Sequence, residues 1–330
     1  MYLERAFYYR ARDGEERQMD PQPLFAQPIT RLDYLDPGYE SHASDVWLVE
    51  TAVERVVVRI SRPTAGRDDD PFWYGCRHLF GIDPQAIFDL ELVNALLHRL
   101  SSIAVPRVLR KGRLDGRPYV MVEAMPGGRV DDLRDLPDAA LYELGRALAG
   151  IHRPRFPYAG HPSGSLRYPI AAFHGRLAET LRLLVERFHG QDAEMRAALE
   201  DRCAAATALP APPYGSLIMV DLDPTQFLGD GRRLTALVDT EAYAIGPREL
   251  DFIALEYVLD ARSAQAVRAG YTTLLPLPDL RQVRPVYRYL YRLLEIQGDV
   301  DLCEWMRWPT YFDSDVPVGG RTGDRHGTAP

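Results

Sequence analysis

Strand-type and helix-type patterns occupy different parts of this chain, and their separation most limits the folds that the chain can adopt. Short apolar runs rich in Val and Ile fill residues 46–125, whereas apolar residues at helical spacing dominate from residue 137 onwards. Sheet and helices collected in different regions predict an α+β fold with separate layers. With 330 residues, the chain is long enough for two lobes.

The strand-type region predicts a small antiparallel sheet. Residues 46–60 form two β-rich runs around a polar turn, which is a hairpin pattern. Residues 61–85 are broken by Pro, Gly and an Asp run and are predicted to form a long loop or insertion. Apolar spacing over residues 87–100 predicts one helix inserted into the sheet. Two further strands are predicted at residues 105–112 and 117–125.

The Pro-Gly-Gly sequence at residues 126–128 interrupts this pattern. We therefore expect a first lobe of residues 1–125, a second lobe of residues 126–312, and a flexible polar tail at residues 313–330. One strand-rich island, residues 214–246, interrupts the helical region. The predicted helices of the second lobe are residues 137–152, 168–188, 193–209, 247–259 and 280–296.

Composition narrows the class of partner. A formal net charge of −8 argues against a protein that binds the phosphate backbone of nucleic acids, so small molecules are the expected partners. No apolar run approaches the length of a membrane span, and charged residues occupy the N-terminus where a signal peptide would be apolar. We therefore expect a cytoplasmic protein without a membrane partner. The single lysine among many arginines is typical of GC-rich bacterial genomes.

Two segments of the strand-rich island carry aspartates suited to chemistry on phosphates. The first is MVDLDPTQFL (219–228), with Asp221 and, five residues later, Gln226. The second is ALVDTEAYAIGPRELDF (236–252), in which Asp239 ends an apolar strand run. A carboxylate projecting from a strand end is suited to hold magnesium against phosphates. Taken alone, the first segment is equally compatible with a turn capped by aspartates.

Together, these segments resemble the aminoglycoside phosphotransferase, choline kinase and homoserine kinase superfamily over roughly residues 46–259. The resemblance implies the two-lobed protein-kinase-like fold, with a small antiparallel-sheet lobe containing one inserted helix and a larger, mainly helical lobe. The first segment resembles the family's His-Gly-Asp loop with its following Asn, which implies Asp221 as catalytic base and Gln226 as metal ligand. Asp239 matches the metal-binding aspartate, Glu241 the acidic residue after it, and Asp251 a residue that braces the loop.

The resemblance also implies a nucleotide site for ATP or GTP with Mg²⁺ in the first lobe. Arg59, in VVVRIS, takes the position of the phosphate-contacting lysine or arginine. Glu91 is its expected ion-pair partner, with Asp89 as the fallback. The segment from Glu123 to Met125 resembles the hinge, whose backbone would hold the adenine edge.

Two weaker assignments complete the comparison with the family. The nucleotide-covering loop is expected within residues 36–46, although this segment has no clear glycine-rich signature. His152 resembles a histidine at a helix end and is expected to be structural rather than catalytic.

Three departures from the family pattern leave the function open. Met219 replaces the histidine, Val220 the glycine, and Gln226 the asparagine of the loop, although both aspartates remain. One reading is a kinase that phosphorylates a hydroxyl of a small metabolite or antibiotic. A second is a catalytically impaired pseudokinase that binds nucleotide or serves as a scaffold, and a third is a different transfer reaction in the same cleft. No sequence motif identifies the substrate.

Overall fold

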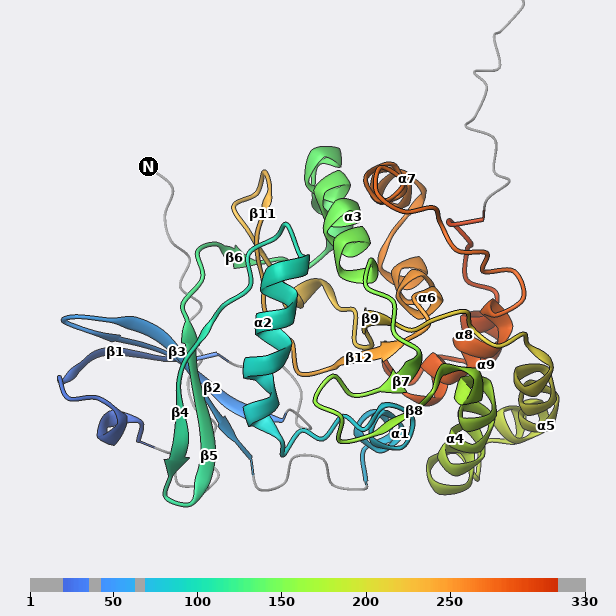
Figure 1. The fold of residues 1–330 in the computed structure, drawn as a ribbon, viewed down its shortest axis with the longest axis horizontal. Helices are drawn as coiled ribbons and strands as arrows, with labels where there is room; N and C mark the ends of the chain where they lie inside the picture. Colours follow the sequence, from blue (N-terminus) through green and yellow to red (C-terminus); the bar gives the residue numbers. More distant parts are fainter. Residues whose placement is uncertain (1–19, 36–42, 63–68, 314–330) are drawn as a thin grey trace, which may run out of the picture.

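The structure is a computed structural model that describes residues 20–35, 43–62 and 69–313, and these residues form two lobes (Figure 1). The smaller lobe contains a five-stranded antiparallel sheet in the order β1-β2-β3-β5-β4. The larger lobe is mainly helical, which confirms the predicted α+β fold. The strands of the small lobe are β1 (Ile29–Tyr34), β2 (Ser44–Thr51), β3 (Arg55–Ser61), β4 (Val108–Leu114) and β5 (Arg117–Glu123).

Two predicted segments cannot be compared with the structure in full. Residues 36–42 of the expected nucleotide-covering loop lie outside the described residues, as do residues 314–330 of the expected tail.

Alternating burial along the strands gives the small lobe its own core. β2 buries Trp47 and Val49, and β3 buries Val58 and Ile60. These side chains form one cluster with Met121 of β5. Side chains alternate between the two faces of a strand. Arg59, between Val58 and Ile60, therefore points to the opposite face of the sheet.

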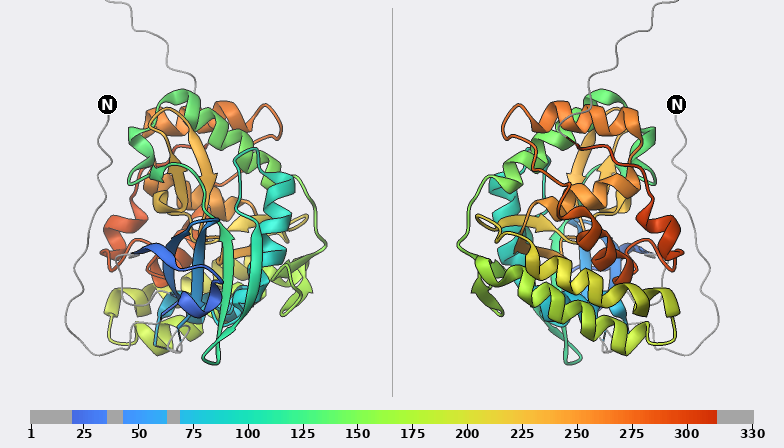
Figure 2. Two further views of the ribbon diagram at one scale, coloured as in Figure 1. Left: turned by 90° about the vertical axis from the view of Figure 1, so that its left-hand side faces the viewer. Right: turned by 90° about the vertical axis from the view of Figure 1, so that its right-hand side faces the viewer.

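The larger lobe is built from seven helices within the described residues, which pack around one continuous core. In Figure 2, the view from the helical side shows α4 and α5 packed side by side across the lower part of the lobe. The helices are α3 (Asp138–His152), α4 (Phe173–Phe188), α5 (Ala193–Ala208), α6 (Glu249–Val258), α7 (Ala261–Tyr271), α8 (Arg284–Leu293) and α9 (Leu302–Met306).

The segment 61–85, predicted as a loop, instead contains helix α1 (Pro71–Phe80). The Asp70 side chain caps its first turn by accepting a hydrogen bond from the Trp73 N–H at 3.0 Å. The helix ends at Gly81, whose φ of 73° lies in the left-handed region. The proline and glycines interpreted as breaks are partly helix-terminal signals. α1 packs against α4, so this insertion contributes to the core of the larger lobe.

Helix α2 (Leu90–Leu100) is the inserted helix that the sequence predicted, and it connects the two lobes. Its only asparagine, Asn94, is buried, and the Nδ2 of Asn94 donates to the Pro106 carbonyl at 2.9 Å. The Oδ1 of Asn94 accepts a hydrogen bond from the Thr240 hydroxyl. α2 is therefore fastened to a loop of the larger lobe.

β1 and α7 are among the elements that the sequence did not predict. β1 is an edge strand with mostly exposed side chains, so it lacks the alternating apolar pattern of β2 and β3. α7 has few large apolar residues and packs closely against α3 through glycines. A Cβ on Gly145 would lie 2.0 Å from the Val267 carbonyl oxygen, and one on Gly270 would lie 1.9 Å from that of Tyr142.

Two small sheets in the larger lobe position its polar loops. One has the order β11-β10-β6, and the other has the order β8-β7-β12-β9. β6 begins at the last glycine of the Pro-Gly-Gly sequence and pairs with β10, so the chain joins the larger lobe at this point. Their strands are β6 (Gly128–Arg129), β7 (Tyr158–Gly160), β8 (Arg167–Pro169), β9 (Ser216–Met219), β10 (Phe227–Gly229), β11 (Leu234–Leu237) and β12 (Tyr243–Gly246).

A buried charge network holds the last described segment against the helices. The carboxylate of Glu256 is fully buried and accepts hydrogen bonds from Arg284 at 3.1 Å, Arg288 at 2.7 Å and the Tyr311 N–H at 3.1 Å. Arg288 also donates to three backbone carbonyls within residues 306–309. This pairing offsets part of the cost of burying the charges of Glu256, Arg284 and Arg288.

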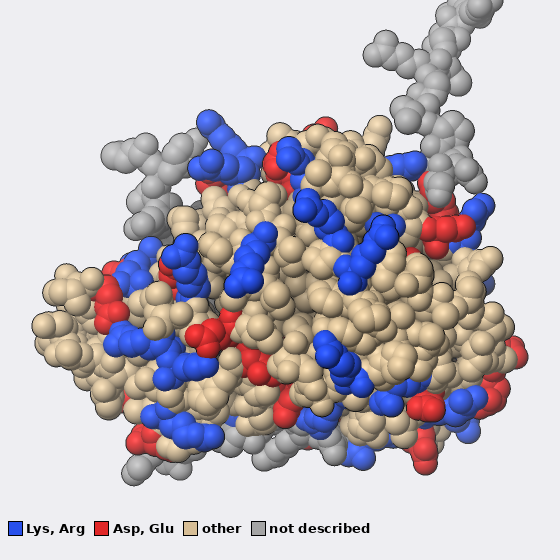
Figure 3. Space-filling model, viewed as in Figure 1, with Lys and Arg blue, Asp and Glu red and all other residues tan. Residues whose placement is uncertain are grey.

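None of the helices in residues 20–35, 43–62 and 69–313 is long and apolar enough to span a bilayer. Figure 3 shows Lys and Arg side chains interspersed with Asp and Glu over the small lobe, on the face seen in Figure 1.

Candidate active site

Two neighbouring loops of the larger lobe carry the predicted aspartates. Asp221 lies in the loop between β9 and β10, and Asp239 lies in the loop between β11 and β12. β9 and β12 pair antiparallel, with Met219 opposite Tyr243. Asp221 follows β9 and Asp239 precedes β12, so this pairing brings the two aspartates to the same end of the sheet.

Asp221 lies in a strongly acidic environment. Burial, together with the negative charges of Asp239, Asp223 and Asp70, raises the pKa of its carboxyl from 3.8 to about 7. Within the described residues, no basic side chain forms an ion pair with Asp221. A carboxyl with a pKa near neutrality can exchange a proton with a substrate at physiological pH.

The loop of Asp239 is fastened to the small lobe by charge. The Nη2 of Arg59 lies 2.8 Å from the Oδ1 of Asp239 and 2.6 Å from the Oε1 of Glu241. The Ser44 hydroxyl also donates to the Oε1 of Glu241, at 3.1 Å. Asp239 has a φ of 54°, a left-handed conformation that aspartate tolerates better than most residues. Its side chain remains 46% exposed, which leaves it accessible to a ligand.

Gln226 has the feature expected of a metal ligand. Its side chain is buried, and its Oε1 has no hydrogen-bond partner within the described residues. A buried amide oxygen without a partner is costly, and a bound cation would supply a partner for it. The Gln226 carbonyl accepts a hydrogen bond from the Val238 N–H at 2.8 Å, which ties it to the loop of Asp239. Oxygen donors of this kind fit Mg²⁺.

A buried hydrogen-bond network braces the loop of Asp221. Both carboxylate oxygens of Asp251 accept from the Met219 N–H, at 3.0 and 3.1 Å. Asp251 also lies 2.9 Å from His152, whose other ring nitrogen lies 3.0 Å from the Tyr271 hydroxyl. His152 and Asp251 are fully buried. These contacts agree with the structural roles expected for both residues, and they reach the loop through its backbone although Met219 replaces the family histidine.

Comparison with known protein families identifies the family to which this chain belongs. The model of the phosphotransferase enzyme family matches residues 38–286, which is more than half of the chain. The chain belongs to this phosphotransferase family. A comparison with curated proteins found no match.

Solved structures of several phosphotransferases share the fold. Spectinomycin phosphotransferase, solved with ADP and spectinomycin, has 11% identity and a TM-score of 0.57, covering 87% of this chain and 92% of that chain. The GDP complex of a mutant aminoglycoside 2′-phosphotransferase IIIa has 17% identity and a TM-score of 0.53, covering 87% and 91%. Macrolide 2′-phosphotransferase from Brachybacterium faecium has 13% identity and a TM-score of 0.52, covering 84% and 96%. At these identities, the likeness establishes the fold.

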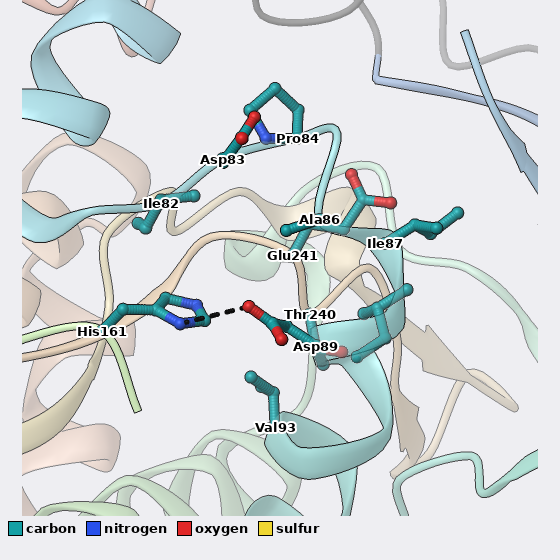
Figure 4. Close-up of a pocket in the computed structure, with 11 residues that line it drawn as sticks. Ile82, Asp83, Pro84, Ala86, Ile87, Asp89, Val93, His161, Thr240 and Glu241 are labelled. Atoms are coloured by element: carbon teal, nitrogen blue, oxygen red, sulfur yellow. Dashed lines mark ion pairs between the residues drawn. The ribbon is translucent and has the colours of Figure 1, made fainter. Parts of the chain in front are cut away.

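The expected ion pair between Arg59 and Glu91 is absent from this phosphotransferase. Glu91 lies on the outer face of α2, is 54% exposed, and pairs instead with Lys111 of β4. The fallback, Asp89, lies 3.6 Å from His161. Figure 4 shows the Asp89 carboxylate turned toward His161 in a pocket that Glu241 also lines. Helical spacing identified the helix correctly, but it did not determine which carboxylate faces the cleft.

Part of the segment expected to be the hinge already forms hydrogen bonds with another part of the chain. The Glu123 N–H donates to the Arg107 carbonyl at 3.1 Å, and the Oε2 of Glu123 accepts from the Arg107 N–H at 3.0 Å. Because that N–H is already used, Glu123 cannot offer it to a nucleotide. Met125 is two residues further along, beyond the end of β5, and remains the candidate for backbone recognition.

The sequence did not reveal that α1 contributes to this site. Asp70, at the start of α1, raises the pKa of both Asp221 and Cys76 through its charge. Burial is the main cause of the raised pKa of the Cys76 thiol. The available signal was an aspartate followed directly by Pro71, because this pair marks a helix start.

Proposed function

We propose that this protein transfers the γ-phosphoryl group of ATP or GTP to a hydroxyl of a small molecule, either a metabolite or an antibiotic. The observation that supports the proposal is that Asp221 and Asp239 lie near enough for the charge of Asp239 to raise the pKa of Asp221, with Arg59 reaching Asp239 from the small lobe. Phosphoryl transfer depends mainly on positioning and charge stabilisation, and this constellation supplies groups for both.

In the proposed reaction, Asp221 orients the acceptor hydroxyl and takes its proton. The hydroxyl oxygen bonds to the γ-phosphorus while the bond from that phosphorus to the β–γ bridging oxygen breaks, and the nucleoside diphosphate leaves. The proton passes to a carboxylate oxygen of Asp221. A pKa of about 7 suits this role, because an appreciable fraction of Asp221 is ionised at neutral pH and still has useful basicity.

The other residues are proposed to hold the nucleotide. Arg59 would contact its phosphates, because a guanidinium can donate two parallel hydrogen bonds to phosphate oxygens. The backbone at Met125 would contact the base. Asp239 and Gln226 would hold Mg²⁺, a fit supported by the unpartnered buried Oε1 of Gln226. A bound magnesium ion neutralises charge on the transferring phosphoryl group.

Structural neighbours guide the choice of nucleotide and acceptor. Spectinomycin phosphotransferase was solved with ADP and its antibiotic, and the aminoglycoside 2′-phosphotransferase was solved with GDP. We therefore retain both ATP and GTP as donors and propose a small-molecule acceptor. The net charge of −8 makes nucleic acid an unsuitable partner. We propose a cytoplasmic location, where both nucleotides are available.

A nucleotide-binding protein without transfer activity is the second candidate. It is favoured by the position of Arg59, which contacts two acidic side chains, Asp239 and Glu241, in the cleft. The replacement of the family asparagine by Gln226 also lengthens the amide side chain by one methylene. Both features affect the groups that would meet the metal and the phosphates.

The two candidates differ in a transfer assay. Purified protein is incubated with ATP or GTP labelled at the γ-phosphate, with Mg²⁺ and a panel of small hydroxyl compounds that includes aminoglycosides, macrolides and sugar amines. Label transferred by the wild type but not by Asp221→Asn would support the kinase. Magnesium-dependent nucleotide binding without transfer to any member would favour the non-catalytic candidate.

A further inference from the structure

Three consecutive residues of the loop before β12 each contact the small lobe. Asp239 pairs with Arg59 of β3, the Thr240 hydroxyl donates to Asn94 of α2, and Glu241 accepts from both Ser44 of β2 and Arg59. The loop is therefore fixed to three different elements of the small lobe. Such a connection defines where Arg59 lies relative to the aspartates of the larger lobe.

Glu241 is more enclosed than Asp239, the other carboxylate that contacts Arg59 within the described residues. Its side chain is 11% exposed and that of Arg59 is 12% exposed, whereas that of Asp239 is 46% exposed. An Arg–carboxylate contact shielded from water is stronger and more directional than an exposed one. Asp239 is also a proposed metal ligand, so its oxygens have a competing role that the enclosed Glu241 carboxylate need not share.

The helix α2 offers no carboxylate for this role. Glu91 is exposed and paired with the chain's single lysine, Lys111, on the outer surface of the small lobe. Asp89 faces His161. Figure 4 places the carboxylates of Asp89 and Glu241 on different parts of the same pocket wall. Of these three carboxylates, only Glu241 contacts Arg59.

We propose that Glu241 is the positioning residue for Arg59, holding its guanidinium for the nucleotide phosphates in place of a carboxylate on α2. This inference rests on the proposed function, because it assumes that Arg59 meets a nucleotide. Glu241 acts through Arg59 and does not itself contact the reacting atoms. The Ser44 hydroxyl holds the same Oε1 of Glu241 by its hydrogen bond.

The pairing itself is tested without ligand. Urea unfolding is measured for Arg59→Gln, Glu241→Gln and Glu91→Gln, and for the double variants of Arg59 with each glutamate. We expect the shift in urea midpoint of Arg59→Gln/Glu241→Gln to be smaller than the sum of the single shifts. Each single substitution already breaks the Arg59–Glu241 pair, so the second substitution has no pair left to break. Arg59→Gln/Glu91→Gln should show additive shifts. Additive shifts in the first double variant would overturn the pairing.

The positioning role is tested by titration calorimetry of ADP binding in the presence of magnesium. Arg59→Gln and Glu241→Gln should each weaken ADP binding roughly tenfold, and the double variant should bind no more weakly than Arg59→Gln. Glu91→Gln should bind like the wild type. The Mg²⁺ concentration for half-saturation should rise in Asp239→Asn and stay unchanged in Glu241→Gln.

Three results would contradict the positioning role. A raised magnesium requirement in Glu241→Gln would make Glu241 a metal ligand instead. Tighter ADP binding in Glu241→Gln would mean that Glu241 only withholds Arg59 from the phosphates. Weaker binding in Glu91→Gln would restore the role to α2. If the wild type binds no nucleotide, the proposed function fails along with the positioning role, while the unfolding experiment still decides whether Arg59 and Glu241 form a pair.

Discussion

Burial raises the pKa of Asp221, and the negative charges of Asp239, Asp223 and Asp70 raise it in the same direction. The unfolded chain relieves both, so its carboxyl there returns to a pKa near 3.8. Because the folded pKa is raised, the folded state binds the proton more tightly than the unfolded state between these two values. Stability therefore falls as the pH rises from about 4 to about 7.

Replacing Asp221 by asparagine should remove this loss of stability at higher pH and should also strongly reduce transfer. At pH 8, Asp221→Asn should raise the free energy of unfolding by roughly 1–3 kcal/mol, a discounted value because the side chain is partly exposed. Well below pH 3.8, where both states are protonated, the difference should vanish. Urea unfolding of the wild type and the variant at the two pH values measures this difference in stability. A difference independent of pH would contradict its assignment to the raised pKa of Asp221. Transfer activity should fall by about 10²–10⁴-fold.

At the scale of the element, Asp70 both caps helix α1 and raises the pKa of Asp221. Asp70→Asn keeps an N-cap oxygen but removes the charge, whereas Asp70→Ala removes both. Both variants should lower the pKa of Asp221, so activity should persist to lower pH. Only Asp70→Ala should lose the cap, at about 0.5–2 kcal/mol of stability. An unchanged pH–activity profile in both variants would show that Asp70 is too remote to matter.

The sequence predicted the elements whose own residues carry a periodic apolar pattern. The helix over residues 87–100 and the hairpin over residues 46–60 were found where expected, because each places its apolar side chains on one face. β1 and α7 were missed, since an exposed edge strand and an alanine-rich helix lack large apolar periodicity. α1 was missed because its proline and glycine were interpreted as breaks.

The candidate site was only partly accessible from the sequence. The neighbourhood of Asp221 and Asp239 follows from two strand-ending motifs, which sequence spacing can reveal. The partner of Arg59 could not be deduced, because it depends on which side of α2 faces the cleft and on tertiary contacts between Glu241 and two strands. The contribution of Asp70 likewise depends on how α1 packs in the larger lobe.

At the scale of the whole molecule, the buried network of Glu256 holds α6, α8 and the last described segment together. Glu256→Ala should leave the buried guanidinium of Arg288 without its carboxylate and destabilise the protein by about 3–5 kcal/mol. Glu200→Ala is the matched control, because Glu200 is 75% exposed in its pair with Arg182. It should change stability by less than about 0.5 kcal/mol. Similar thermal shifts in both variants would contradict the network's importance.

The central claim is that both lobes together form a magnesium–nucleotide site. Calorimetric titration of ATP and GTP, with and without Mg²⁺, into the wild type and Asp239→Ala tests it most directly. We expect nucleotide binding that depends on magnesium in the wild type and is lost or weakened in the variant, because Asp239 is a proposed metal ligand. Binding of neither nucleotide under any condition, or magnesium-dependent binding that Asp239→Ala leaves intact, would contradict the account.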